Sequence, residues 1–369
     1  MTKPIKNIAV LGQGGVGSLV AALCRDLGMN VTGVDRDDHH VPPGVTFQNV
    51  DLADEKALDQ LMQGQDAVVC CLPYYLNAGV AKAAHKHGVH YFDPTEDVET
   101  LNLVRDLAKT SRAAMIPQNG LAPGFIGIAG AHLARQFDAG EKLRHIKMRV
   151  GALPQHPIGQ LGYAFNWSPT GLVNECIKPC DVISDGVQQK VPALSDLETL
   201  RIEGDGYEAF NTSGGLGTMC ETYAGKVETL NYKTIRYFGH AAGMKLLLED
   251  LRFKDEPEVL AKRMADTLPP DPNDRVLIYT SAQGKMRGRI ETRTFVADYR
   301  PIELAGGRRT AITWTTACSI VAVIELVSSG KLPQTGFSKQ EDILLPDFLA
   351  TQNGSYYAKN HKTLAQGVM

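Results

Sequence analysis

Three glycines near the start of the chain have the spacing of a phosphate-binding loop. Gly12, Gly14 and Gly17 form a G-x-G-x-x-G pattern, and Asp35 follows 18 residues after Gly17. The first glycine of such a loop permits a tight turn, the second lets the backbone approach a pyrophosphate, and the third lets a helix pack on a strand. A carboxylate at this distance can accept hydrogen bonds from adenosine ribose hydroxyls. The pattern predicts a dinucleotide site; a glycine-rich turn in another α/β protein is the alternative.

The residues around the glycines favour the dinucleotide site. Ile8–Leu11 is typical of a buried parallel strand, a helical pattern begins at Val16, and Val31–Val34 indicates a second strand that ends at Asp35. Asp35 disfavours a 2′-phosphate and therefore favours NAD over NADP. Arg36 can pair with that phosphate or lie over the adenine, so NADP is not excluded.

The first third of the chain repeats strand and helix patterns. Strands are expected at residues 8–11, 31–34, 45–50, 67–72, 89–92 and 113–116. With right-handed crossovers they form a doubly wound parallel sheet of order 3-2-1-4-5-6, which binds ligands beyond the carboxyl ends of its strands. The cofactor contacts expected there are Gly12, Gly14, Gly15, Val16, Gly17, Asp35, Arg36, Asp51, Leu52, Cys71, Leu72, Pro73, Asn119 and Gly120.

After Gly130 the rhythm changes to the alternating runs of a second, α+β domain. Its strands are expected at residues 146–150, 182–184, 188–191, 200–202, 276–281 and 289–297. A charged helix is expected over Met244–Phe253, and Asn77 is expected to cap an earlier one. Lys262–Asp274 contains three prolines and is interpreted as a loop or linker, and Thr310–Ser328 as a long buried helix. The expected domains are residues 1–122, 123–308 and a returning segment, 309–369.

Composition and charge narrow the class of protein. Apolar residues make up 43% and charged residues 21%, as in an ordinary globular protein, and the net charge of −3 gives no reason to expect nucleic acid or an anionic membrane. No basic, apolar leader opens the chain, and Glu325 interrupts the apolar run Thr313–Val327, so a cytoplasmic location is expected. The seven cysteines are scattered and are expected to be reduced. Cys176 and Cys180 lack a second Cys/His pair nearby, so no metal site is expected.

Several longer motifs carry a family resemblance. CLPYY (Cys71–Tyr75), YFDPTED (Tyr91–Asp97) and GLAPGF (Gly120–Phe125) follow the glycine loop. Farther on come NWSPTGLVNE, EAFNTSGGLGT and LNYKTIRYFGH, the last ending at His240. Together they resemble the saccharopine dehydrogenase-like family, and within it the lysine 6-dehydrogenases, over nearly the whole chain. The resemblance implies an N-terminal Rossmann domain, an inserted α+β domain for substrate binding and dimerisation, a C-terminal return to the first domain, and a homodimer or higher homo-oligomer.

The reaction that the resemblance implies is NAD-dependent oxidative deamination of the ε-amine of L-lysine. A lysine side chain has a pKa of about 10.4, so a proton acceptor is needed before hydride can leave. Asp93 is one candidate, because it lies at a strand tip, and His240 is the other, because histidine titrates in the useful range. The alternatives are a helix-capping or turn aspartate before Pro94 and a histidine held in a structural hydrogen bond.

The remaining candidates would bind substrate. Lys233 and Arg236 can hold a carboxylate, with a salt bridge inside the domain as the alternative. Glu96 is a further acid, for which a solvated place in the first turn of a helix is the alternative, and Asn119 can hold the nicotinamide amide. Aromatic and amide side chains that can line a pocket, or belong to the core, are Tyr163, Asn166 and Trp167.

Two other functions stay open. Saccharopine and carboxynorspermidine dehydrogenases share the family and act on a secondary amine formed from an amine and a keto acid or aldehyde. A dinucleotide sensor or scaffold would keep the Rossmann fold without catalysis. The polar residues within Asn211–Thr218 and Lys233–His240 favour an enzyme, because a sensor has no need of them.

Overall fold

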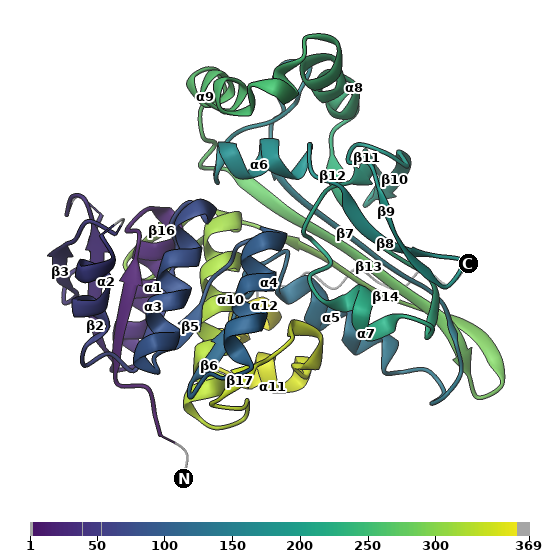
Figure 1. Ribbon diagram of the computed structural model, residues 1–369. Helices are drawn as coiled ribbons and strands as arrows, with labels where there is room; N and C mark the ends of the chain where they lie inside the picture. Colours follow the sequence, from purple (N-terminus) through teal and green to yellow (C-terminus); the bar gives the residue numbers. More distant parts are fainter. Residues whose placement is uncertain (1–2, 39, 53, 360–369) are drawn as a thin grey trace. The chain divides into compact units, whose positions relative to one another are not determined.

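The computed structural model describes residues 3–38, 40–52 and 54–359, which form two compact units (Figure 1). Unit 1 contains residues 3–125, 303–307 and 313–359, and unit 2 contains residues 126–302 and 308–312. The sequence predicted boundaries after residues 122 and 308, and the units divide after residue 125 and within residues 303–313. Residues 360–369 of the predicted C-terminal segment lie outside the described residues.

Unit 1 is built on a parallel sheet with the order β17-β6-β5-β4-β1-β2-β3. Its strands are β1 (Asn7–Leu11), β2 (Asn30–Asp35), β3 (Thr46–Asn49), β4 (Ala67–Cys70), β5 (His90–Phe92), β6 (Ala114–Ile116) and β17 (Gly336–Phe337). The predicted doubly wound fold and its order 3-2-1-4-5-6 are confirmed. β17 extends the sheet beyond β6 and was not predicted, because two residues carry no periodicity.

Capping residues begin two helices of unit 1, and a glycine ends a third. Asp54 accepts a hydrogen bond from the backbone N–H of Lys56, and Asp97 accepts one from Thr100. Gly88 ends a helix in the left-handed conformation. The helices are α1 (Gly15–Asp26), α2 (Glu55–Met62), η1 (Tyr74–Leu76), α3 (Asn77–His87), α4 (Val98–Ala108), η4 (Gln340–Asp342), α11 (Leu345–Ala350) and α12 (Ser355–Lys359). A core cluster of apolar residues joins α2, α3 and α4 to the sheet.

Two predictions about helices need correction. Asn77 does not cap α3 but is its first residue, and its Oδ1 accepts a hydrogen bond from the Cys70 thiol, 3.1 Å away. Helix α10 (Ala311–Ser328) is long and apolar enough to cross a membrane by length and composition, despite Glu325. However, 72% of this stretch is buried within the structure, as in the core helix of a globular protein.

Unit 2 contains a mixed sheet with the order β10-β11-β12-β7-β13-β14, and β8 connects β12 to β9. The strands are β7 (Leu143–Pro154), β8 (Cys180–Ser184), β9 (Val187–Val191), β10 (Glu198–Ile202), β11 (Asp205–Asn211), β12 (Val227–Arg236), β13 (Asp274–Met286) and β14 (Arg289–Tyr299). The short strands β15 (Ile302–Leu304) and β16 (Gly307–Arg309) follow. β11 and β12 were not predicted, because polar side chains such as Glu208 and Lys233 occupy buried positions and hide the alternation.

The helices of unit 2 correct two further predictions. They are α5 (Phe125–Ala134), α6 (Pro169–Glu175), α7 (Met219–Tyr223), α8 (His240–Lys245), the π-helical turn η2 (Leu246–Asp250), η3 (Phe253–Asp255) and α9 (Pro257–Thr267). The predicted helix 244–253 is therefore divided among three shorter elements. The predicted loop 262–274 is wrong up to Thr267, because Leu260, Ala261 and Met264 bury one face of α9 and the prolines begin only after its end.

Candidate functional site

The loop between β1 and α1 has the form that a pyrophosphate requires. A Cβ on Gly12, whose φ is +87°, would lie 2.7 Å from the Cys71 carbonyl oxygen, and one on Gly17 would lie 1.8 Å from the Gly12 carbonyl oxygen. No described atom lies within 4 Å of a Cβ built on Gly14, so the loop is open there. Among the described residues no side chain caps α1, and its first turn, from Gly15 and Val16, contains no acid. The positive end of α1 thus fits a bound phosphate group.

Asp35 joins the end of β2 to this loop. Its Oδ2 accepts a hydrogen bond from the Gln13 backbone N–H at 2.6 Å, and its Oδ1 accepts one from the Arg36 N–H at 2.6 Å. Each carboxylate oxygen has a second acceptor position, which leaves room for ribose hydroxyls. The Arg36 side chain is exposed beside it.

The other predicted cofactor residues divide into two groups. Cys71 follows β4 and lies against the loop, with its Cβ 3.2 Å from a Cβ built on Gly17. Leu72 is half-buried and Pro73 is exposed after it. Asp51 and Leu52 follow β3 at the edge of the sheet, where Asp51 is exposed and Leu52 packs on the core of unit 1.

Asp93 is fully buried at the carboxyl end of β5. Its Oδ1 accepts hydrogen bonds from the backbone N–H groups of Thr95 (2.8 Å) and Gln118 (3.2 Å). Its backbone carbonyl accepts from the N–H of Asn119 at 2.9 Å. Burial raises the pKa of the Asp93 carboxyl to about 6. These contacts correspond to the turn alternative, because the carboxylate accepts from the backbone two residues on and holds the segments after β5 and β6 together.

Asn119 presents an unpaired oxygen at the same edge of the sheet. The side chain is fully buried, and its Nδ2 donates to the Ile116 carbonyl at 3.0 Å. Its Oδ1 has no hydrogen-bond partner among the described residues. A nicotinamide carboxamide could donate to this oxygen, as the sequence predicted. A Cβ on the next residue, Gly120, would lie 3.0 Å from the Cβ of Pro94, so the chain is closely packed here.

Glu96 differs from the solvated acid given as its alternative. It follows β5, one residue before the Asp97 cap of α4, and is half-buried. Burial, followed by the negative charges of Asp97 and Asp93, raises the pKa of its carboxyl to about 7. Glu96 therefore changes protonation near neutral pH and keeps an accessible surface, as a proton acceptor must.

In unit 2, four predicted residues lie together in a group that we call the Arg236 cluster: Tyr163, Trp167, Arg236 and His240. The Arg236 guanidinium lies over the Tyr163 ring, with its Cζ 4.9 Å from the ring centroid. The Tyr163 and His240 rings meet edge to face at 5.4 Å, and Trp167 Nε1 donates to the Tyr163 hydroxyl at 2.5 Å. Phe210, which the sequence did not single out, stacks on His240.

His240 does not titrate in the range that the sequence suggested. It is 1% exposed, and its Nδ1 is 2.8 Å from the Leu161 carbonyl oxygen. Burial, followed by the positive charge of Arg236, lowers its pKa to about 3. The ring is therefore neutral at physiological pH, and the reason for choosing it as a general base is wrong.

Arg236 is a buried cation without a carboxylate partner in the described chain. It is 4% exposed, its Nη1 donates to the Ile235 carbonyl at 2.8 Å, and its Nε has no partner among the described residues. Glu208 is its neighbour in the strand register, but the Glu208 carboxylate accepts the N–H groups of Gly239 and Ala241 at 3.0 and 2.6 Å. The salt bridge given as the alternative for Arg236 is therefore not formed within residues 3–38, 40–52 and 54–359, and the guanidinium can receive an anion.

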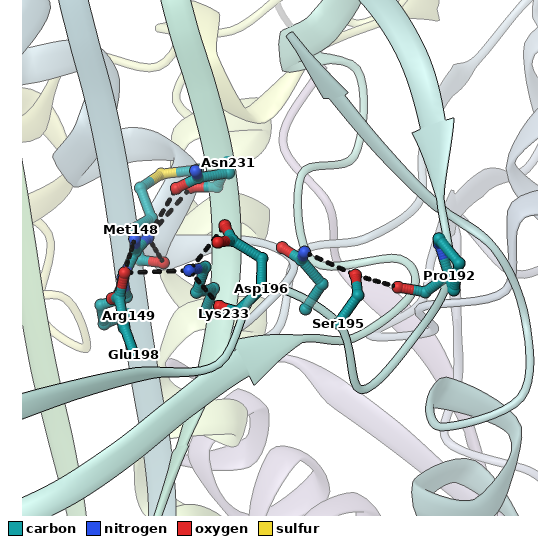
Figure 2. Close-up of polar contacts among 9 residues, drawn as sticks. Met148, Arg149, Pro192, Ser195, Asp196, Glu198, Asn231 and Lys233 are labelled. Atoms are coloured by element: carbon teal, nitrogen blue, oxygen red, sulfur yellow. Dashed lines mark hydrogen bonds and ion pairs between the residues drawn. The ribbon is translucent and has the colours of Figure 1, made fainter. Parts of the chain in front are cut away.

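Lys233, three residues earlier on β12, is already neutralised (Figure 2). Its Nζ lies 2.7 Å from Asp196 Oδ2 and 2.9 Å from Glu198 Oε2. Glu198 also pairs with Arg149, whose Nη1 donates to Asn231 Oδ1 at 2.7 Å (Figure 2). Lys233 thus has the internal salt bridge that was its alternative, and we assign it to the structure of unit 2.

We expect Lys233→Met to lower the free energy of unfolding by about 1–3 kcal/mol, because Glu198 and Asp196 lose a buried donor. Urea denaturation of the native and variant chains measures this change. Substrate affinity should stay within about twofold in the folded variant. Normal stability combined with a large loss of substrate affinity would return Lys233 to the site.

Asn166 holds a loop. Its Nδ2 donates to the Asp271 carbonyl at 2.7 Å, and its Oδ1 accepts from the Asp271 N–H at 2.8 Å. Both ends of the amide are occupied, so we assign Asn166 to the loop after α9. Glu208, which orders the backbone around His240, was missed in the sequence; its acidic side chain in the EAFNTSGGLGT motif was the available signal.

No group of three or more His, Cys, Asp or Glu side chains suited to a metal ion occurs among the described residues. Cys176 and Cys180, the pair with metal-like spacing, are both buried free thiols.

Comparisons with known proteins agree with this architecture. Residues 8–118 match the family model of the saccharopine dehydrogenase NADP binding domain, and residues 120–352 match that of the saccharopine dehydrogenase C-terminal domain. A solved structure, apo histidine-tagged saccharopine dehydrogenase (L-Glu forming) from Saccharomyces cerevisiae, has the same fold. Its TM-score is 0.72 at 18% identity, over 96% of this chain and 97% of that one.

Two relatives are similar in sequence over part of their length. Saccharopine dehydrogenase [NADP(+), L-glutamate-forming] of Saccharomyces cerevisiae is 23% identical over 274 residues, which is 70% of this chain and 61% of the relative. Mitochondrial alpha-aminoadipic semialdehyde synthase of Rattus norvegicus is 24% identical over 254 residues, 65% of this chain and 27% of the relative. The chain thus spans less than two thirds of these relatives. Because the two family models together match most of its length, the chain belongs to the saccharopine dehydrogenase family.

Proposed function

We propose that the chain is a pyridine-nucleotide-dependent oxidoreductase that oxidises the ε-amine of L-lysine to an imine, which water hydrolyses to 2-aminoadipate 6-semialdehyde and ammonia. The observation that carries this substrate is the buried guanidinium of Arg236, which forms no ion pair among the described residues. The buried basic side chains of unit 2 are Arg149, Lys233, Arg236 and Arg275. Arg149, Lys233 and Arg275 pair with carboxylates, and Arg236 does not in the described chain. A buried guanidinium without an ion pair suits a substrate with a carboxylate, such as lysine.

A second function is a saccharopine-type dehydrogenase that acts on a secondary amine. The family and the names of the two relatives favour it. Saccharopine carries three carboxylates, two of which come from the keto acid. It therefore requires more cationic partners than Arg236 alone supplies among the buried side chains.

Different residues of unit 1 would bind different parts of the dinucleotide. The glycine loop and the first turn of α1 would bind the pyrophosphate, Asp35 the adenosine ribose, and Asn119 Oδ1 the carboxamide. When bound, the nicotinamide accepts a hydride from the carbon that bears the amine.

Proton transfer falls to Glu96 in this proposal. The ε-amine of lysine has a pKa of about 10.4, so its cationic form must lose a proton before hydride can leave. A carboxylate with a raised pKa of about 7 is ionised above neutral pH and can accept that proton. We propose Asp93 as the residue that orders the surrounding backbone, because its Oδ1 already binds two N–H groups.

The test is the absorbance of NADH or NADPH formed by the purified chain. L-lysine alone should support reduction of the dinucleotide, and the product should behave as an aldehyde that cyclises. Reduction with saccharopine but not with lysine, or reverse turnover that requires both an amine and an aldehyde or keto acid, would assign the second function instead.

We expect Asp35 to determine the affinity for NAD. We propose NAD, because a carboxylate at the end of β2 repels a 2′-phosphate. Asp35→Ser should weaken NAD binding about ten- to a hundredfold, since charge-assisted hydrogen bonds are worth about 1.5–3 kcal/mol. Asp35→Asn is the matched control, because it keeps an acceptor for the Gln13 N–H and should mainly reduce the preference for NAD over NADP. Fluorescence titration with both dinucleotides measures these affinities, and unchanged NAD affinity in both variants would remove Asp35 from the site.

A further inference from the structure

His240 has a fixed tautomer that leaves one ring nitrogen as an acceptor. The Leu161 carbonyl can only accept a hydrogen bond, so the Nδ1 atom 2.8 Å away must carry the proton. The other nitrogen, Nε2, then has a lone pair and no proton. Burial and the charge of Arg236 hold the ring in this neutral form by lowering its pKa to about 3.

His240 and Arg236 both contact the ring of Tyr163. Arg236 lies over the Tyr163 ring at 4.9 Å, and His240 meets that ring edge to face at 5.4 Å. Phe210 stacks on His240, so two aromatic rings restrain the imidazole. The cluster thus contains a donor fork for an anion and, near it, a neutral acceptor for a hydrogen-bond donor.

Glu208, the acid beside Arg236 in the strand register, is engaged elsewhere. Its register on β11 puts it beside Arg236, yet both of its carboxylate oxygens bind the backbone on either side of His240. The acid therefore positions the histidine segment and leaves the guanidinium without an ionic partner in the described chain.

We propose that His240 determines specificity for an α-amino acid head group, with its Nε2 accepting a hydrogen bond from the α-ammonium of a ligand whose α-carboxylate binds Arg236. A carboxylate and an ammonium on one carbon match an anion receptor and a neutral acceptor placed close together. The proposal deepens the function given above and rests on its assignment of Arg236. It is stated for the head group, so it holds for any α-amino acid bound there.

Two variants of His240 test the roles of its two ring nitrogens separately. His240→Asn places an amide N–H near the position of Nδ1, keeping the donor to Leu161, and removes the acceptor at Nε2. His240→Gln extends an amide to the position of Nε2 and gives up the Nδ1 contact. Thermal unfolding and circular dichroism of the full chain establish that each variant is folded.

Binding of matched ligand pairs to the full chain, with NADH present so that lysine is not oxidised, provides the measurement. L-lysine is compared with 6-aminohexanoate, and L-norleucine with hexanoate, by isothermal titration calorimetry. Each pair differs only in the α-amino group. The native chain should prefer the amino acid about ten- to a hundredfold, the range expected for a hydrogen bond to a charged group. His240→Asn should remove this preference and leave the affinity for 6-aminohexanoate and hexanoate unchanged, whereas His240→Gln should retain part of it.

Other outcomes overturn the proposal. Equal weakening of both members of each pair in His240→Asn would show that the histidine only packs the cluster. A native chain without preference for the amino acids would remove the α-ammonium site. Because binding is measured, the reaction is tested separately: the preference can be lost with His240 whether or not lysine is turned over, and lysine turnover with a retained preference in His240→Asn would overturn this inference alone.

Discussion

Arg236→Met is expected to raise the KM for L-lysine by at least about a hundredfold, while the KM for NAD changes little. The guanidinium is buried and has no carboxylate partner in the described chain, so the α-carboxylate would supply its counter-charge. Each charge-assisted hydrogen bond is worth about 1.5–3 kcal/mol, and a fork makes two of them. Arg236→Lys keeps the charge but loses the fork and should recover only part of the affinity.

Cadaverine is the substrate control for this prediction, because it is lysine without the carboxylate. It should be a poor substrate for the native chain and should lose little further in Arg236→Met. Equal losses for lysine and cadaverine would show that Arg236 serves the packing of Tyr163 and His240 instead.

Glu96→Gln should lower kcat by about 10²–10⁴-fold, the usual contribution of a general base, while NAD still binds. The pKa of the Glu96 carboxyl is raised to about 7, and only its ionised form accepts a proton. In the native chain, kcat/KM should therefore fall as the pH drops through about 7. It should continue to rise toward alkaline pH, because the free lysine amine loses its proton only near its pKa of about 10.4. In Glu96→Gln the fall in kcat/KM near pH 7 should be absent.

Asp93→Asn is the matched control, since it also neutralises an acid at the end of β5 but keeps an Oδ1 acceptor for Thr95 and Gln118. The fall in kcat/KM near pH 7 should remain in this variant. Loss of the fall in kcat/KM near pH 7 in Asp93→Asn, and its persistence in Glu96→Gln, would make Asp93 the base.

The difference in thermal stability between Asp93→Asn and the native chain should shrink as the pH falls below about 6. Burial raises the Asp93 pKa, so the cost of ionising this carboxyl in the native fold is complete above about pH 6 and is lost as the pH falls from there toward the ordinary aspartate pKa of about 3.9.

The sequence alone determined the fold of unit 1 and the position of its cofactor loop. The glycine spacing, the strand patterns on both sides of it and Asp35 are local features, and each predicts the same structure. The strand order 3-2-1-4-5-6 is that of the doubly wound dinucleotide-binding fold with right-handed crossovers, and it needs no knowledge of side-chain contacts.

Only the tertiary structure decided what Lys233 and Arg236 do. They are basic residues three positions apart in one motif, and residues three apart on a strand point to opposite faces of the sheet. Lys233 meets Asp196 and Glu198, which lie more than 30 residues away in sequence, whereas the acid beside Arg236 is engaged by the backbone around His240. The roles of Glu96 and His240 were decided in the same way. A side chain's type sets its ordinary pKa. Burial and neighbouring charges raise the pKa of Glu96 to about 7 and lower that of His240 to about 3. Burial and neighbouring charges depend on the packing of segments that are distant in sequence.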